Sequence, residues 1–273
     1  MLRQRVLTAL VLIPLVLVAI FALPAPWFLV VIGIVMLAGT REYAPLAGFS
    51  SATAAYGLVI TQLAILAALF VNSGAWVANA LLFATLACAA WLLIFIRLFR
   101  YRPGDQPGAA YRGVSMLTAL VSITTGWCAL GWLRMQPDGS WLLLLFLLTV
   151  WAADTGAYFA GMNFGKRKLA PALSPGKTRA GLIGGLVAAP LIALLAAAAM
   201  PLKPLAPVFL VLLSLVTALA SVGGDLVISL HKRTSGCKDS GSLLPGHGGV
   251  LDRLDSLIAA SPFFVLGLAY YGY

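Results

Sequence analysis

Residues 180–199 read AGLIGGLVAAPLIALLAAAA, a run of twenty residues without a charged side chain. A helix needs about 20 apolar residues to cross the hydrocarbon core of a bilayer, so this run is long enough. The whole chain has the same character, because 62% of its 273 residues are hydrophobic and only 10% are charged. Ordinary soluble domains carry about a quarter charged residues. The sequence therefore predicts an integral membrane protein.

This composition excludes three other classes of protein. A water-soluble globular protein and a disordered chain both need more polar residues than 18 Lys and Arg with 8 Asp and Glu supply. The formal net charge of +10 does not indicate nucleic-acid binding, because the cations stand between apolar runs, where they suit an anionic membrane surface. The three cysteines form no metal-ligand cluster with the two histidines, and we expect neither a zinc site nor a disulfide.

The apolar residues fall into continuous runs, which favours membrane helices over the alternating strands of a transmembrane barrel. We expect an all-α, polytopic fold of about nine transmembrane helices, with Pro24 breaking the first two into a hairpin. The nine segments are 6–23, 27–39, 52–71, 75–99, 113–133, 140–162, 180–199, 205–230 and 255–273. We assign 1–139 to a scaffold region, with lipid-access or dimer contacts, and 140–273 to a catalytic region with cytoplasmic loops 163–179 and 231–254.

The loops predict the orientation of the chain, because Lys and Arg accumulate on the cytoplasmic side of membrane proteins. With nine spans and the N-terminus inside, only Arg134 and Lys203 face outward. The other cations all face inward: Arg3, Arg5, Arg41, Arg97, Arg100, Arg102, Arg112, Lys166, Arg167, Lys168, Lys177, Arg179, Lys232, Arg233, Lys238 and Arg253. We expect a multi-pass protein of the inner cell membrane, with its C-terminus outside and its active site on the cytoplasmic face.

The acidic residues point to the site. Asp154 and Asp225 lie within spans, where a carboxylate costs at least about 2.5–3.5 kcal/mol and usually marks a function; the alternative is a structural ion pair with a neighbouring helix. Asp225 shares a helix face with Ser229, with Lys232 one turn further, and Asp252 shares a face with Asp255. Three convergent aspartates make a hard-oxygen site suited to Mg²⁺.

Two cytoplasmic loops supply groups that suit phosphate. The 231–254 loop places cations before a glycine-rich stretch that contains His247, and backbone N–H groups of such a stretch can surround phosphate oxygens. The 163–179 loop ends in Gly176-Lys177-Thr178, which resembles part of a P-loop. Pro171 stands where that motif requires glycine, and a membrane helix replaces its strand, so it is not a Walker A site.

The residues of the C-terminal half closely resemble the signature of the phosphatidate cytidylyltransferase, or CDP-diacylglycerol synthase, family. The matching pattern is Ser229-x2-Lys232-Arg233-x4-Lys238-Asp239-x-Gly241-x3-Pro245-Gly246-His247-Gly248-Gly249-x2-Asp252-Arg253-x-Asp255-Ser256. Asp154-Thr-Gly-Ala-Tyr158 and Ser174-Pro175-x-Lys177-Thr178 match further family segments in the same order, and Arg41-Glu42-Tyr43 matches in the N-terminal half. The sequence departs from the pattern at His231, where the family normally has an apolar residue.

The resemblance implies an Mg²⁺-dependent nucleotidyltransferase that joins CTP to phosphatidate in the membrane, giving CDP-diacylglycerol and pyrophosphate. It also implies a homodimer. The residues it implies as catalytic are Asp225, Asp252, Asp255, Lys238, Asp239 and His247, with Asp225, Asp252 and Asp255 as metal ligands. Those it implies as substrate-binding are Asp154, Ser174, Lys177, Thr178, Ser229, Lys232, Arg233, Gly246, Gly248, Gly249 and Arg253.

Two alternatives belong to other classes. A CDP-alcohol phosphotransferase also uses liponucleotides, but its Asp-Gly-x2-Ala-Arg motif with two further aspartates at four-residue spacing does not occur in this sequence. An ion-coupled transporter could use Asp154 and Asp225 as midplane ion sites. The position of the polar residues near the inner interface, and the absence of an internal repeat, argue against that alternative.

Overall fold

The computed structural model describes residues 2–49, 51–104, 107–243 and 248–273, with side chains from Leu10 onward. The helices are α1 (Leu2–Ala22), α2 (Ala25–Leu46), α3 (Ala52–Val71), α4 (Ser73–Ala78), α5 (Ala80–Arg100), α6 (Ala109–Met135), α7 (Gly139–Phe164), α8 (Arg179–Ala199), α9 (Pro207–Thr234) and α10 (Leu251–Tyr271). Two strands, β1 (Lys168–Ala170) and β2 (Ser174–Thr178), pair antiparallel between α7 and α8.

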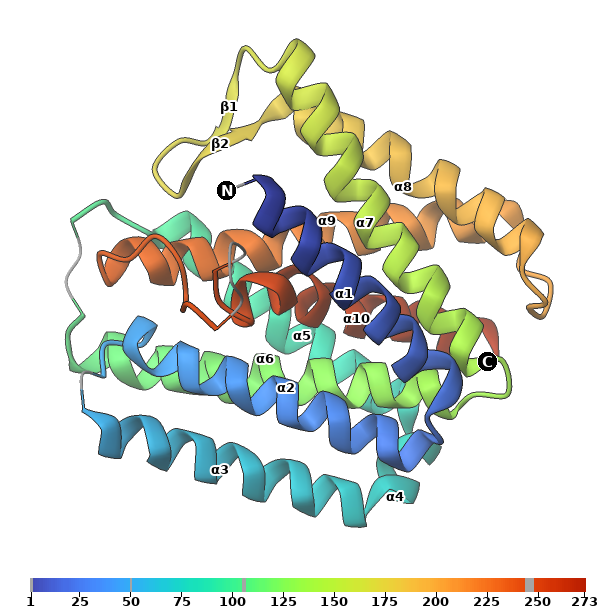
Figure 1. The fold of residues 1–273 in the computed structure, drawn as a ribbon, viewed down its shortest axis with the longest axis horizontal. Coiled ribbons are helices and arrows are strands. Elements are labelled where there is room, and N and C mark those ends of the chain that lie inside the picture. Colours follow the sequence, from blue (N-terminus) through green and yellow to red (C-terminus); the bar gives the residue numbers. More distant parts are fainter. Residues whose placement is uncertain (1, 50, 105–106, 244–247) are drawn as a thin grey trace.

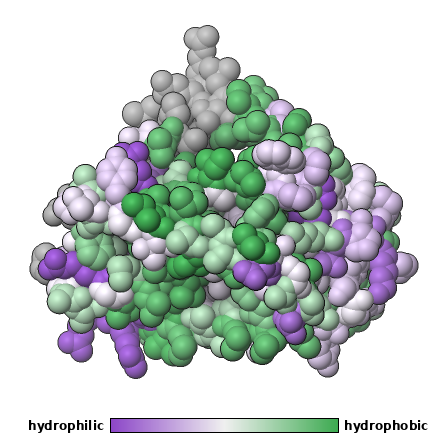
Figure 2. Space-filling model, turned by 90° about the horizontal axis from the view of Figure 1, so that it is seen from below, coloured by the Kyte–Doolittle hydropathy of each residue, from purple (hydrophilic) through white to green (hydrophobic). Residues whose placement is uncertain are grey.

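The polytopic membrane architecture is confirmed. Within the described ranges, eight helices are long and apolar enough to cross a membrane, and α1 contains the shorter apolar stretch Leu10–Ala22. Figure 2 shows a broad hydrophobic band between two more polar ends of the molecule. Large apolar side chains such as Ile60 and Leu93 are more than half exposed, which suits contact with lipid rather than water. The count of nine spans stays a prediction.

The structure corrects the predicted elements at three places. The segment predicted over 27–39 continues as helix to Leu46. The segment predicted over 75–99 is divided into α4 and α5 at Asn79, whose side-chain amide donates to the Ala75 carbonyl over 2.8 Å, a local bond that competes with the helix. The 163–179 connection, predicted as a loop, contains the short β1–β2 hairpin, and the helices around it agree with the predicted all-α class.

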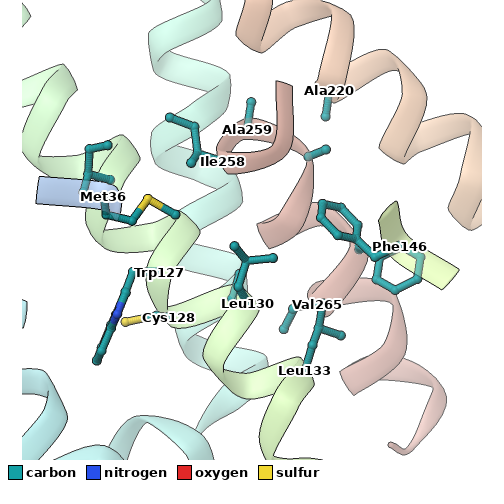
Figure 3. Packing of buried hydrophobic residues seen from close by; sticks show 14 of the residues in the cluster. Met36, Trp127, Cys128, Leu130, Leu133, Phe146, Ala220, Ile258, Ala259 and Val265 are labelled. Carbon is teal, nitrogen blue, oxygen red and sulfur yellow. The ribbon is translucent and has the colours of Figure 1, made fainter. Parts of the chain in front are cut away.

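Helix α10 occupies the middle of the bundle, where it packs against α9, α7, α6, α5 and α2 (Figure 1). Figure 3 shows Ile258, Ala259 and Val265 of α10 among side chains of the neighbouring helices. Small residues permit this central position: a Cβ atom on Gly126 of α6 would lie 2.8 Å from Ile258 Cβ, closer than real contacts allow. The N- and C-terminal regions predicted from the sequence therefore share one core.

Gly156 and Ala160 lie four residues apart, a spacing of small residues that favours close approach of a neighbouring helix, and the structure shows this approach. These residues of α7 face Gly184 and Ala188 of α8, and α7 and α8 pack along most of their lengths. A Cβ atom on Gly184 would lie 2.7 Å from the Gly156 carbonyl oxygen and would also collide with the Ala160 Cβ. This packing of small residues matters because helix association inside a membrane depends on close van der Waals contact.

We expect Gly184→Val to lower the stability of the protein by about 1–3 kcal/mol or more, because overpacking here presses against backbone rather than a movable side chain. Gly57→Ala in α3 is the matched control, since no described atom beyond its own stretch of helix lies within 4 Å of the Cβ it would add. Thermal unfolding in detergent measures both variants. A Gly184→Val protein that unfolds at the wild-type temperature would contradict the packing account.

Candidate functional site

A polar cavity of about 370 Å³ lies where α7, α9 and α10 meet the loop that follows α9. The ends of α2 and α9 and the β1–β2 hairpin lie toward this end of the bundle, whereas the C-terminus lies at the other end (Figure 1). The cavity is lined by Trp151, Asp154, Asp225, Lys232, Asp239, Asp252, Arg253, Asp255, Ser256 and Leu257. The structure thus brings together five of the aspartates singled out in the sequence.

Asp225 stands on the cavity wall formed by α9. Its Oδ1 accepts a 3.3 Å hydrogen bond from the Ser229 hydroxyl, which confirms that the two share a helix face. Its Oδ2 lies 2.6 Å from Lys177 Nζ, and the side chains of Asp225 and Lys177 are 36% and 24% exposed. Because Lys177 belongs to β2, the hairpin delivers a cation to the aspartate of a neighbouring helix.

Asp252 is the most firmly held carboxylate of the cavity. It lies in the first turn of α10, with its side chain 8% exposed, and Lys232 Nζ donates to its Oδ1 over 2.8 Å. Its Oδ2 accepts from the backbone N–H groups of Ser240 and Gly249 over 2.9 and 3.1 Å. These three donors fix the orientation of the Asp252 carboxylate, and hydrogen bonds to a charged group are the strong ones.

Asp255 lies one turn further along α10, as the predicted spacing requires. It is buried, its Oδ1 accepts a 2.7 Å bond from the Ser256 N–H, and it borders the same cavity as Asp154 of α7. Lys232 and Arg253 stand on the same wall. The cavity therefore combines concentrated negative charge with cations at its edge, an arrangement that suits a ligand carrying both phosphate groups and a divalent metal.

The donor set fits Mg²⁺, although a complete protein cage is not formed. All the carboxylates offer hard oxygen atoms, and no His or Cys is among the described residues that line the cavity. In the part of the chain that the structure describes, no three His, Cys, Asp or Glu side chains converge closely enough to hold a metal by themselves. Mg²⁺ usually keeps several waters and binds through one or two carboxylates together with substrate phosphates, so such a cage is not required.

Several predicted residues lie away from the cavity. The Arg233 Nε donates to the Leu173 carbonyl over 3.1 Å, and Arg233 borders a separate cavity of about 480 Å³ between the ends of α2 and α9. Thr178 is buried, and its hydroxyl caps α8 by accepting from the Gly181 N–H over 3.0 Å. Ser174 opens β2 without bordering the cavity, and Lys238 is exposed. The side chains of Thr178 and Arg233 thus make hydrogen bonds within the protein, and their predicted contact with substrate stays a prediction.

The glycine-rich loop is only partly described. Gly248 has a positive φ of +78°, a backbone conformation that favours glycine, and Gly249 directs its N–H at Asp252. The N–H groups of Gly249 and Ser240 hold the Asp252 carboxylate. Contact of this loop with phosphate stays a prediction. Gly246 and His247 lie outside the described residues.

Two buried polar residues near the site, Glu42 and His231, were not assigned a role from the sequence. Glu42 of α2 accepts hydrogen bonds from Ser240, Val250 and Leu251. His231, where the sequence departs from the family pattern, is fully buried, with its ring centroid 5.0 Å from that of Tyr43 and its Nε2 3.2 Å from Arg97 Nη1. Two signals were available for Glu42: it belongs to the Arg41-Glu42-Tyr43 match, and it is the sole acidic residue before residue 105.

Comparisons with known proteins agree with this geometry. A model of the cytidylyltransferase family matches residues 3–271. The chain is 40% identical to a phosphatidate cytidylyltransferase of Pseudomonas aeruginosa, with 97% of this chain and 96% of that protein covered. It is 36% identical to a phosphatidate cytidylyltransferase of Haemophilus influenzae, with 97% of each covered. The chain therefore belongs to the cytidylyltransferase family.

Proposed function

We propose that this protein is a phosphatidate cytidylyltransferase, which transfers CMP from CTP to phosphatidate and yields CDP-diacylglycerol and pyrophosphate. The observation that carries the proposal is the cavity that joins five aspartates to Lys232 and Arg253, with Lys177 paired to one of the aspartates, at one end of a membrane bundle. The near full-length similarity to proteins named for this activity supports it. Family membership leaves the transporter and CDP-alcohol phosphotransferase alternatives without support.

In the proposed reaction, a phosphate oxygen of phosphatidate attacks the α-phosphorus of CTP, and the bond from that phosphorus to the β-phosphate bridging oxygen breaks. The attacking oxygen is already anionic, so the protein needs no strong general base. Its main tasks are to position the two substrates and to offset their negative charge, as in other phosphoryl-transfer enzymes. The cations of the cavity perform the second task, since Lys177, Lys232 and Arg253 lie at its edge or on its wall.

Asp225 and Asp252 are the proposed ligands of Mg²⁺, with Asp255 beside them. When bound, Mg²⁺ would neutralise charge on the phosphates and on the departing pyrophosphate. The two aspartates also hold the lysines: Lys177 is fixed by Asp225 and Lys232 by Asp252. Each lysine side chain is thereby preorganised, so less conformational entropy is lost when it binds a phosphate.

We further propose that the site faces the cytoplasm of the inner membrane, with the N-terminus inside and the C-terminus outside. Sixteen of the 18 cations fall on the cytoplasmic side of this topology, where each also attracts anionic lipid by about 1 kcal/mol. Homodimer formation stays a prediction.

Cysteine labelling tests the orientation. Cys237 is exposed in the loop after α9, whereas Cys88 and Cys128 are buried. Lys203 lies in the connection between α8 and α9, at the opposite end of the bundle. In intact cells we expect a membrane-impermeant maleimide to spare Cys237 in the wild-type protein. The same reagent should modify a Lys203→Cys variant made in a Cys237→Ser background. Labelling of Cys237 from outside the cell would reverse the proposed topology.

Turnover by the purified protein tests the reaction. With phosphatidate present, we expect CTP to be converted at a rate well above that of ATP. Omission of phosphatidate should abolish pyrophosphate release, since no other acceptor is proposed. Equal turnover of ATP would contradict the assignment of the nucleotide, and pyrophosphate release without lipid would contradict the assignment of the acceptor.

A further inference from the structure

Glu42 connects the N-terminal part of the chain to the cavity through the loop before α10. The residue is 7% exposed, and both carboxylate oxygens accept hydrogen bonds. Oε1 accepts from the Val250 N–H over 3.1 Å, and Oε2 accepts from the Leu251 N–H over 2.9 Å and from the Ser240 hydroxyl over 3.0 Å. One carboxylate thus ties two separate parts of this loop to α2.

These contacts supply the cap that α10 does not provide for itself. Val250, in the N-cap position, makes no side-chain cap hydrogen bond, yet the first N–H groups of a helix need acceptors. Glu42, which belongs to α2, accepts hydrogen bonds from two of these N–H groups, those of Val250 and Leu251. Its negative charge also lies at the positive end of the α10 dipole. A buried carboxylate with three such donors has a defined place rather than a range of conformations.

The loop is shaped around this carboxylate. A Cβ atom on Gly241 would lie 2.6 Å from Glu42 Cδ, and one on Gly249 would collide with Glu42 Oε2. Side chains at these two positions would therefore displace Glu42. The absence of side chains lets both backbone segments approach the carboxylate directly.

The same loop holds the carboxylate of Asp252. The backbone N–H of Ser240 and that of Gly249 both donate to Asp252 Oδ2, and Ser240 donates to Glu42 through its hydroxyl. Asp252 in turn holds Lys232. A contiguous set of hydrogen bonds therefore runs from Glu42 through the loop to one aspartate and one lysine of the cavity.

We propose that Glu42 is a positioning residue for Asp252 and Lys232, acting through the loop rather than by contact with substrate. The inference rests on the proposed function for its kinetic consequences. Glu42→Gln keeps the shape of the side chain but replaces one acceptor oxygen with an amide N–H₂ group, which can only donate. This group would face the N–H of Val250, or the N–H of Leu251 together with the Ser240 hydroxyl, and a backbone N–H cannot accept a hydrogen bond. At least one bond to the loop is lost, and the loop loosens.

We expect Glu42→Gln to raise the KM for CTP about tenfold or more, the loss typical of one hydrogen bond to a charged group. It should also lower the unfolding temperature, because one buried N–H group loses its acceptor. Hydrogen exchange of the full-length protein in nanodiscs should show faster exchange at the Val250 and Leu251 amides. Ser240→Ala removes one bond from the loop side and should change both quantities in the same direction but less. Glu42→Asp keeps the charge and should restore part of the affinity.

Gln62→Leu is the matched control, because Gln62 is a buried polar residue of α3 whose amide donates to Thr124 rather than to the loop. It should leave the KM and the loop exchange unchanged. The positioning role is overturned if Glu42→Gln leaves exchange at Val250 and Leu251 unchanged, or if its activity falls only in proportion to the amount of folded protein. If the wild type transfers no CMP, the proposed function fails, while the exchange comparison still decides whether Glu42 holds the loop.

Discussion

Asp225→Asn should reduce turnover by about a thousandfold or more while the protein folds normally, because the metal's stabilisation of charge in the transition state is worth several kcal/mol. Asparagine keeps the size of the side chain and can still accept the 3.3 Å bond from Ser229, but it removes the charge that Mg²⁺ requires. The Asp225 side chain is 36% exposed, so the ion pair with Lys177 is partly screened by solvent and its loss should change stability little.

Asp252→Asn should reduce turnover to a similar degree but also lower the unfolding temperature. Asp252 is 8% exposed, and its two oxygens together serve Lys232 and two backbone N–H groups. An asparagine has one acceptor oxygen, so it cannot accept from Lys232 and from the two backbone N–H groups at once. A buried donor left without an acceptor lowers the stability of the folded protein. The comparison of Asp225→Asn with Asp252→Asn therefore separates loss of chemistry from loss of structure.

Asp138→Asn is the matched control for both variants. Asp138 precedes α7 at the opposite end of the bundle, where its Oδ2 accepts a 3.3 Å bond from the Lys203 N–H. Initial rates at saturating CTP, normalised to folded protein from size-exclusion chromatography, measure all three. Substantial Mg²⁺-dependent activity in Asp225→Asn would show that this carboxylate is not a metal ligand.

Lys177→Met should reduce kcat/KM by about a hundredfold, since removal of one preorganised charge donor from a site of this kind typically costs about 10²–10³ in rate. Methionine keeps the length and apolar stem of lysine and removes only the charge. Because the hairpin holds Lys177 Nζ 2.6 Å from Asp225, the cation is placed before substrate arrives. The defect should appear with CTP at every phosphatidate concentration.

Lys168→Met is the control on the same hairpin. Lys168 of β1 pairs with Thr178 across the two strands, is exposed, and does not border the cavity. It should retain near wild-type kinetics, which would exclude a general effect of hairpin charge on membrane binding. Equal losses in the two variants would assign the effect to membrane attraction and would remove Lys177 from the site.

The periodicity and charge of the sequence predicted the membrane class, the helices and the aspartates that meet in the cavity. These features are local: spacing of i, i+3 and i, i+4 places Asp225 with Ser229 and Asp252 with Asp255 on one face, whatever the surroundings. The close contact at Gly156 has a local cause of the same kind, because small residues at four-residue spacing let two helices approach.

Other features depend on tertiary contacts that the sequence does not display. Arg233 follows Lys232 directly, but consecutive residues on a helix point in different directions, and of the two Lys232 alone reaches the cavity. Thr178 looks like a phosphate ligand beside Lys177, yet the start of α8 needs its hydroxyl as a cap. Glu42 stands 198 residues before Ser240 in the chain, so its role is evident only once α2 and α10 are packed together.

The most direct test of the account is the fate of the two ends of the CTP triphosphate. Purified protein is incubated with phosphatidate and with CTP radiolabelled on either the α- or the γ-phosphate, and the lipid is then extracted. The account predicts that the α-label enters the lipid as CDP-diacylglycerol and that the γ-label remains in the aqueous phase as pyrophosphate. With Asp225→Asn, it predicts no detectable α-label in the lipid. Label from the γ-phosphate in the lipid, or no lipid label from the wild-type protein, would contradict the proposed transfer of CMP.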